Sequence, residues 1–91
     1  MKTYIITCFD KKNSLKKRLA NRELHLEYLK SFKKKLILAG PILNKTNKPK
    51  GSVLILKFRN KLELNNFLKN DPYSKVGLFE TVNIEIFKRV F

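Results

Sequence analysis

The middle of the chain, residues 36–58, reads LILAGPILNKTNKPKGSVLILKF and predicts a β-hairpin. The first strand is the short apolar run at residues 36–39, which we expect to end at Gly40-Pro41. A polar segment without periodicity, residues 44–50, forms the connecting loop. The second strand covers residues 52–58, which are rich in Val, Leu and Ile. The rest of the fold is built on either side of this hairpin.

On the N-terminal side of the hairpin, the sequence predicts a strand followed by a long helix. Residues 2–9 are mostly β-branched, aromatic or small and apolar, and Asp10 begins the polar segment that closes this strand. Such a continuously apolar run is typical of a central strand that is covered on both faces. Apolar residues at helical spacing predict a helix over about residues 14–35, with a break or second start at Asn21.

On the C-terminal side, the sequence predicts a second helix and a fourth strand. Asn60 and Glu63 have the spacing of a capping box, which opens a helix through Leu68. Asp71-Pro72 ends this helix, because the proline ring disfavours the α conformation at the preceding residue. The fourth strand covers residues 81–87.

The predicted order of elements is βαββαβ. Right-handed crossovers place both helices on one face of a four-stranded antiparallel sheet, which is the ferredoxin-like α+β fold. The 91 residues suffice for one domain, so we expect residues 1–91 to form a single unit. The other face of the sheet lacks cover, and a second copy of the chain would supply it. We therefore expect a homodimer.

Composition limits the location and partners of the protein. No apolar run approaches the roughly 20 residues of a membrane span, so we expect a soluble chain without a membrane partner. The single cysteine excludes an internal disulfide and favours the reducing cytoplasm. The formal net charge is +14, and the 21 basic residues comprise 17 lysines and only 4 arginines. Base readers and phosphate clamps favour arginine, which is scarce here. Lys, Asn and Ile all have A/T-rich codons, so we interpret the lysine surplus as coding bias rather than a nucleic-acid interface.

Few residues could carry chemistry. His25 lies on the same helical arc as Leu29 and Phe32, which directs its imidazole toward the sheet, and Arg22 lies one turn earlier on a similar bearing. A histidine in this position more often only packs. The carboxylate of Asp71 follows the second helix on the same sheet face, where it could reach His25 and hold it as a general base. An anion at a helix C-terminus is unfavourable, which hints at a role beyond ending the helix.

The remaining candidates are weaker. Cys8 belongs to the first predicted strand, and we interpret it as a core residue. One histidine, one cysteine and scattered carboxylates have no metal-ligand spacing, so we expect no metal. The chain also has no glycine-rich phosphate loop.

Several motifs occur in a specific order along the chain: Arg22-Glu23-Leu24-His25-Leu26, Ala39-Gly40-Pro41, Asp71-Pro72-Tyr73, Gly77-Leu78 and the closing Phe87-Lys88-Arg89-Val90-Phe91. In this ordered set the sequence resembles the YciI-like (YCII-related) family over nearly its whole length. The resemblance implies a ferredoxin-like dimeric α+β barrel with a cleft built around a His–Asp pair, to which His25 and Asp71 correspond. The connection at residues 42–50 is shorter than in many family members, which leaves the substrate class open if it walls the cleft.

The resemblance also implies a reaction. Relatives include a dehydrochlorinase of a chlorinated hydroxyquinol, and similar barrels include muconolactone isomerases. We therefore expect cofactor-free proton transfer, elimination or isomerisation on a small cyclic substrate such as a lactone or hydroxylated aromatic. His25 and Asp71 would be catalytic, while Arg22, Gly40, Pro41 and Tyr73 would contact the substrate. The alternatives are a non-catalytic ligand-binding or regulatory module of the same fold and, third, a basic nucleic-acid-binding protein.

Overall fold

Four strands and four helices follow one another along residues 1–91 of the computed structural model. In chain order they are β1 (Lys2–Asp10), α1 (Leu15–Ala20), α2 (Arg22–Lys30), β2 (Leu36–Leu43), β3 (Pro49–Phe58), α3 (Lys61–Asn70), α4 (Pro72–Lys75) and β4 (Phe79–Ile86). The strands form one antiparallel sheet in the order β2-β3-β1-β4. This arrangement confirms the predicted ferredoxin-like α+β fold.

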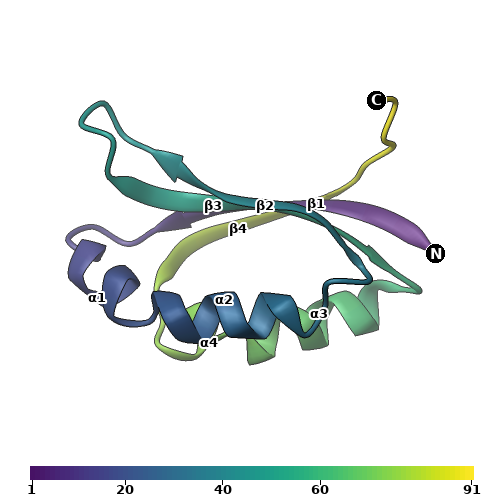
Figure 1. Cartoon of the computed structure of the whole chain (residues 1–91), viewed down its shortest axis with the longest axis horizontal. Coiled ribbons are helices and arrows are strands. Elements are labelled where there is room, and N and C mark those ends of the chain that lie inside the picture. Colours follow the sequence, from purple (N-terminus) through teal and green to yellow (C-terminus); the bar gives the residue numbers. More distant parts are fainter.

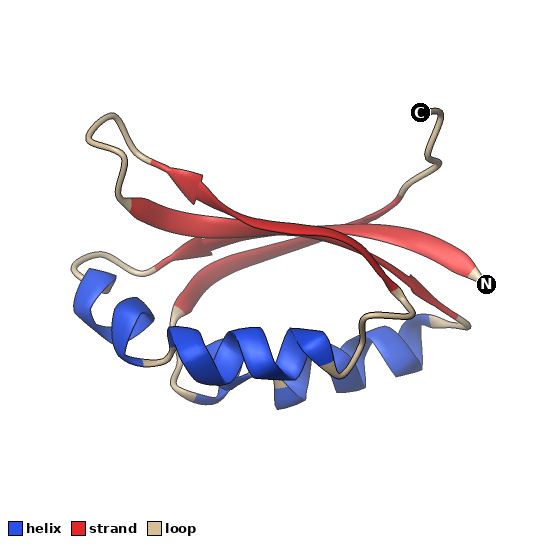
Figure 2. Cartoon of the chain, viewed as in Figure 1, coloured by secondary structure: helices blue, strands red, loops and turns tan.

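The molecule has two layers, with all helices beneath one face of the sheet (Figures 1 and 2). The core lies between the layers, where alternate residues of the two central strands meet the apolar sides of α2 and α3. Its buried members are Tyr4, Ile6, Cys8, Leu29, Leu54, Leu56, Phe58, Leu64 and Phe67. Because β1 pairs with both β3 and β4, it occupies a central position, as the sequence predicts.

The helices begin and end where polar side chains or the local backbone require it. The side chain of Asn60 accepts a hydrogen bond from the backbone N–H of Glu63, which caps α3 as predicted. The long helix predicted over residues 14–35 is divided at Asn21 into α1 and α2, and α2 ends at Lys30. Residues 31–35 are turns rather than helix, so the predicted C-terminal end of this helix is wrong.

Strand β2 is longer than the sequence predicts. It continues through Gly40-Pro41 to Leu43, and Pro41 pairs with Ser52 of β3. The expectation that Gly40-Pro41 ends the strand fails because β2 lies at the edge of the sheet. An edge strand has a neighbour on one side only, so the missing N–H of Pro41 costs no hydrogen bond to a second neighbouring strand.

The sheet face opposite the helices has no cover within the chain (Figure 1). Paired residues of antiparallel strands share a face, so Ile5 opposite Ile55 and Thr7 opposite Val53 lie together on this open side. Phe9 of β1 is 41% exposed and Leu38 of β2 is 55% exposed. Strand β1 is therefore covered on one face only within a single chain, and the expected homodimer stays a prediction.

The longest helix, α3, has 10 residues, and no helix has the length and apolar character needed to cross a membrane.

Candidate functional site

A cleft of about 220 Å³ opens where α1, α2 and α4 meet strands β2 and β3. Five of the six residues singled out from the sequence line it: Arg22, His25, Gly40, Pro41 and Tyr73. The cleft is smaller than the roughly 300–1,000 Å³ that is typical of sites for drug-sized ligands, so its size suits a single-ring molecule. The β2–β3 connection contributes to its wall through Pro49 at the start of β3.

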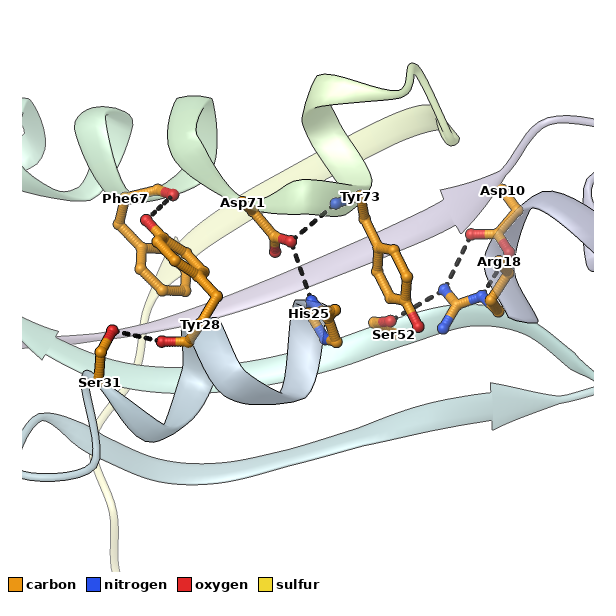
Figure 3. A network of polar contacts seen from close by, with 9 residues as sticks. All are labelled: Asp10, Arg18, His25, Tyr28, Ser31, Ser52, Phe67, Asp71 and Tyr73. Atoms are coloured by element: carbon orange, nitrogen blue, oxygen red, sulfur yellow. Dashed lines mark hydrogen bonds and ion pairs between the residues drawn. The ribbon is translucent and has the colours of Figure 1, made fainter. Parts of the chain in front are cut away.

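The sixth residue, Asp71, lies behind His25. Nδ1 of His25 is 2.9 Å from Oδ1 of Asp71, and the two side chains are 7% and 0% exposed (Figure 3). An ionised carboxylate can only accept hydrogen bonds, so Nδ1 of the imidazole is the donor. Since Nδ1 is used in this way, Nε2 is the nitrogen that remains for a ligand in the cleft.

Asp71 ends α3 where the sequence predicts, and it has a second structural role that the sequence analysis did not identify. Asp71 follows α3 but also caps the short helix α4, because its Oδ1 accepts a hydrogen bond from the backbone N–H of Tyr73 at 3.0 Å. Pro72 occupies the first turn of α4, where its missing N–H costs no hydrogen bond. Asp71 is thus the C-cap of α3, as the sequence predicts, but it is at the same time the N-cap of α4, where a carboxylate is favourable.

The second oxygen of Asp71 has no partner. Oδ2 is buried and accepts no hydrogen bond. A buried carboxylate is costly unless hydrogen bonds or an opposite charge offset the loss of water. The Oδ1 contacts to His25 and Tyr73 are its hydrogen bonds, so a positive charge on His25 would stabilise it further.

The ring of Tyr73 packs against one face of the His25 imidazole and holds it in place. The rings of Tyr73 and His25 are stacked, with centroids 3.9 Å apart and planes inclined by 14°. The guanidinium of Arg18 lies over the same tyrosine ring, 4.7 Å from its centroid. Burial raises the pKa of the Tyr73 hydroxyl, and Arg18 and Arg22 offset only part of this effect. The hydroxyl is therefore protonated near neutral pH and can act as a donor.

Arg18 is the site residue that sequence reasoning missed. It is 4% exposed and lines the cleft. Its Nε and Nη2 donate to the two carboxylate oxygens of Asp10 at 2.6 and 2.9 Å, and Nη2 also donates to Oγ of Ser52 at 2.9 Å (Figure 3). Burial acts to lower the pKa of Arg18, but the hydrogen bonds and the charge of Asp10, together with Tyr73, outweigh burial and raise the pKa above its usual value.

A signal for Arg18 exists in the sequence. Arg18, Arg22 and His25 have i, i+4, i+7 spacing, which places them along one side of a helical segment. The spacing that relates Arg22 to His25 leads to Arg18 when it is extended one turn further toward the N-terminus.

Cys8 lies in the core and not at the site. Its side chain is fully buried, and burial raises its pKa from 9.0 to about 12, with a smaller contribution from Asp71. No three side chains of His, Cys, Asp or Glu are grouped so that they could hold a metal ion.

The sequence of the chain matches a known family. The chain matches the YCII-related domain over residues 2–88 and belongs to that family. A protein of Haemophilus influenzae is 35% identical over 96 residues, covering 97% of this chain and 98% of the relative. Protein YciI of Escherichia coli is 34% identical with the same coverage.

Solved structures share the fold. The 5-chloro-2-hydroxyhydroquinone dehydrochlorinase TftG of Burkholderia phenoliruptrix, in complex with 2,5-dihydroxybenzoquinone, superposes with a TM-score of 0.90 at 33% identity. The match covers 96% of this chain and 94% of TftG. Protein Atu4242 of Agrobacterium tumefaciens has a TM-score of 0.60 at 19% identity, covering 99% and 94% of the two chains, and shows similarity of fold alone.

Proposed function

We propose that this protein is a small cofactor-independent enzyme that moves a proton on a cyclic substrate, leading to elimination or isomerisation. The observation that carries the proposal is the 2.9 Å contact between Nδ1 of His25 and Oδ1 of Asp71 at the wall of a ring-sized cleft. A histidine oriented by a buried carboxylate is suited to general acid–base catalysis.

In the proposed reaction, Nε2 of His25 takes a proton from a carbon or hydroxyl group of the substrate ring. The electron pair of the broken bond moves into the ring. In an elimination this pair expels a leaving group such as chloride, so the ring loses one proton and one anion. In an isomerisation the imidazolium returns the proton to another carbon. Asp71 stabilises the imidazolium in both cases, because its buried charge is otherwise incompletely balanced.

The remaining lining residues would position the substrate. Arg22 is exposed at the cleft and would attract an anionic or phenolic group, whereas Gly40 and Pro41 of β2 and the ring of Tyr73 would contact the substrate ring. The 33% identity to TftG over nearly the whole chain supports an enzyme of this type.

We also propose that the protein works as a homodimer in the cytoplasm. The open sheet face with the exposed side chains of Phe9 and Leu38 supports a second copy as its cover. The lone thiol of Cys8, buried and unpaired, suits a reducing compartment.

The test is to assay 5-chloro-2-hydroxyhydroquinone first, followed by muconolactone as a ring that can isomerise, and to record chloride release and ring absorbance. We expect turnover by the wild type and a loss of roughly 10²–10⁴-fold in His25→Gln, because the general base is removed. Arg59→Gln is the control, since it removes one charge from an exposed residue paired with Glu63 outside the cleft. Undiminished activity in His25→Gln contradicts the proposal. Tight binding of these rings without product favours the non-catalytic ligand-binding alternative.

A further inference from the structure

A second hollow, of about 270 Å³, lies at the end of the molecule opposite α1, near the N-terminus of the chain in Figure 1. It shares no residue with the cleft around His25. Its wall is made by the beginning of β1, the beginning of α3 and the last part of β4. The hollow lies on the helix side of the sheet, so a second copy on the open sheet face would leave it free.

The hydroxyl of Tyr4 is a hydrogen-bond donor without an acceptor. Tyr4 is 5% exposed, and the centroid of its ring lies 6.4 Å from that of Phe58 in the core. The hydroxyl of Tyr28 donates to the carbonyl oxygen of Phe67, but that of Tyr4 makes no hydrogen bond within the chain. Only Oδ2 of Asp71 is both unpartnered and sealed from solvent, so the Tyr4 hydroxyl reaches open space. The open space that Tyr4 lines is this hollow, where a ligand can supply the acceptor.

The ten-residue helix α3 begins at the wall of the hollow, which Asn60 and Lys61 both line. The side chain of Asn60 accepts from the backbone N–H of Glu63, and its carbonyl oxygen accepts from that of Leu64. The N–H groups of Lys61 and Leu62, which come first in the helix, have no acceptor in the chain. Free N–H groups at the positive end of a helix dipole favour an anion.

The charges around the hollow are mainly positive. Lys2 and Lys61 line it, and neither ammonium group pairs with a carboxylate of the chain. Arg59 also lines the hollow, but its guanidinium already pairs with an acidic residue of α3 at 3.3 Å. The one acidic lining residue is Glu85, which is paired with Ile5, so its side chain stands on the open face of the sheet. The two free ammonium groups are therefore not neutralised from within the hollow.

The β4 side of the hollow is apolar. Ile84 and Ile86 line it and share the helix side of the sheet with Tyr4, which is paired with Ile86. A phosphate group suits the polar side, because it has three strong acceptor oxygens and a charge of about −1.5 to −2 near neutral pH. Its oxygens can accept from a hydroxyl, a backbone N–H and an ammonium group at the same time. The isoleucines can contact an apolar substituent of the same molecule.

We propose that this hollow is a binding site for the phosphate group of a small molecule, separate from the cleft. The hydroxyl of Tyr4 and the backbone N–H of Lys61 donate to the phosphate oxygens. The ammonium groups of Lys2 and Lys61 offset its charge. This assignment goes beyond the proposed function, because no step at His25 requires it.

Calorimetric titration with inorganic phosphate and with phenyl phosphate tests the site, at about 0.15 M salt so that diffuse attraction to the basic chain is screened. Tyr4→Phe should weaken phosphate binding by roughly 10-fold or more, because it removes a hydrogen bond to a charged group. This variant should unfold at the same temperature as the wild type without ligand, since the hydroxyl bonds to nothing in the chain. Lys61→Gln should weaken binding by roughly 2–5-fold, as expected of an exposed ion pair.

Lys69→Gln is the matched control, since it removes the same charge from an exposed position at the other end of α3. It should bind both probes as the wild type does. Tighter binding of phenyl phosphate than of inorganic phosphate supports the site and identifies an ester as its ligand, whereas the reverse order supports it as a site for the free ion.

NMR of the wild type locates the bound phosphate. At saturation the backbone amide signal of Lys61 should shift, whether or not any turnover at His25 is found. Four results overturn the assignment: no binding of either probe, unchanged affinity in Tyr4→Phe, equal losses in Lys61→Gln and Lys69→Gln, or shifts confined to the cleft around His25. None of these results bears on the proposed reaction, which is tested separately through His25→Gln.

Discussion

Asp71 links the fold to the site through a single oxygen. Its Oδ1 accepts hydrogen bonds from the backbone N–H of Tyr73 and from the imidazole of His25. The first contact fixes the start of α4 and the second fixes the ring that faces the cleft. A substitution at this position must keep the hydrogen bond that caps α4. Otherwise its effect on the imidazole cannot be separated from its effect on the helix.

Asp71→Asn meets this condition, because Asn and Asp cap helices about equally well. We expect the variant to fold normally. Any His25-dependent activity should fall by roughly 10²–10⁴-fold, because the imidazolium loses its counter-charge. The ¹⁵N shifts of the His25 ring should show the proton on Nδ1 in the wild type and a changed tautomer balance in the variant. An unchanged tautomer together with full activity would contradict the assigned role of Asp71.

Cys8 gives a pH-dependent prediction. The thiol has a pKa of about 12 in the folded chain because it is buried, against 9.0 for an ordinary thiol. Above pH 9 the unfolded chain releases this proton and the folded chain keeps it, so stability falls as pH rises from about 9 toward 12. We expect the stability advantage of the wild type over Cys8→Ala to decrease by about 1.4 kcal/mol per pH unit in this window. Urea unfolding at pH 8, 9, 10 and 11 measures it, and parallel profiles of the two proteins would contradict it.

At the scale of elements, the close approach of β3 and β1 depends on Gly51. A Cβ at this position would lie 2.3 Å from the carbonyl oxygen of Cys8, whereas a Cβ on Gly40 would meet nothing within 4 Å. Gly51→Ala should therefore lower the free energy of unfolding by about 1–3 kcal/mol or more, since backbone atoms must move. Gly40→Ala is the matched control and should change it little within one chain. Equal effects in denaturant titrations would contradict this packing.

The elements also show what the sequence can and cannot predict. Local patterns predicted the strands of the hairpin, the Asn60 cap and the side of the helix that carries His25, because each depends on neighbours within one or two turns. Helix α4 has only four residues and therefore no periodicity to detect. The continuation of β2 through Pro41 depends on the edge position of that strand, and the burial of Arg18 depends on an aspartate supplied by β1. Both are consequences of tertiary structure.

For the whole molecule, the open sheet face and the charge act in opposite directions on the proposed dimer. Apolar side chains on this face favour association, but each copy carries a formal net charge of +14. Salt screens such repulsion, with a Debye length of about 30 Å at 0.01 M and 10 Å at 0.1 M. We therefore expect the dimer to tighten as salt increases from 0.02 to 0.5 M, which sedimentation equilibrium can measure.

Substitution identifies the surface involved. Phe9→Lys places a charge on the open face and should give a monomer at every salt concentration. Leu62→Lys adds the same charge to an exposed position of α3 and should leave the dimer intact. A dimer that persists in the first variant, or weakens with salt in the wild type, contradicts association through this face.

The central position of β1 in the sheet has a consequence for folding during synthesis. Strand β1 is made first, yet its two neighbours are β3 and β4, and β4 is the last strand in the chain. An incomplete nascent chain therefore carries an apolar strand with an unpaired edge until residues 79–86 have been synthesised. The contacts of His25 with Asp71 and Tyr73 likewise form only later, so neither the cleft nor the sheet is complete before residues 71–86 have been synthesised.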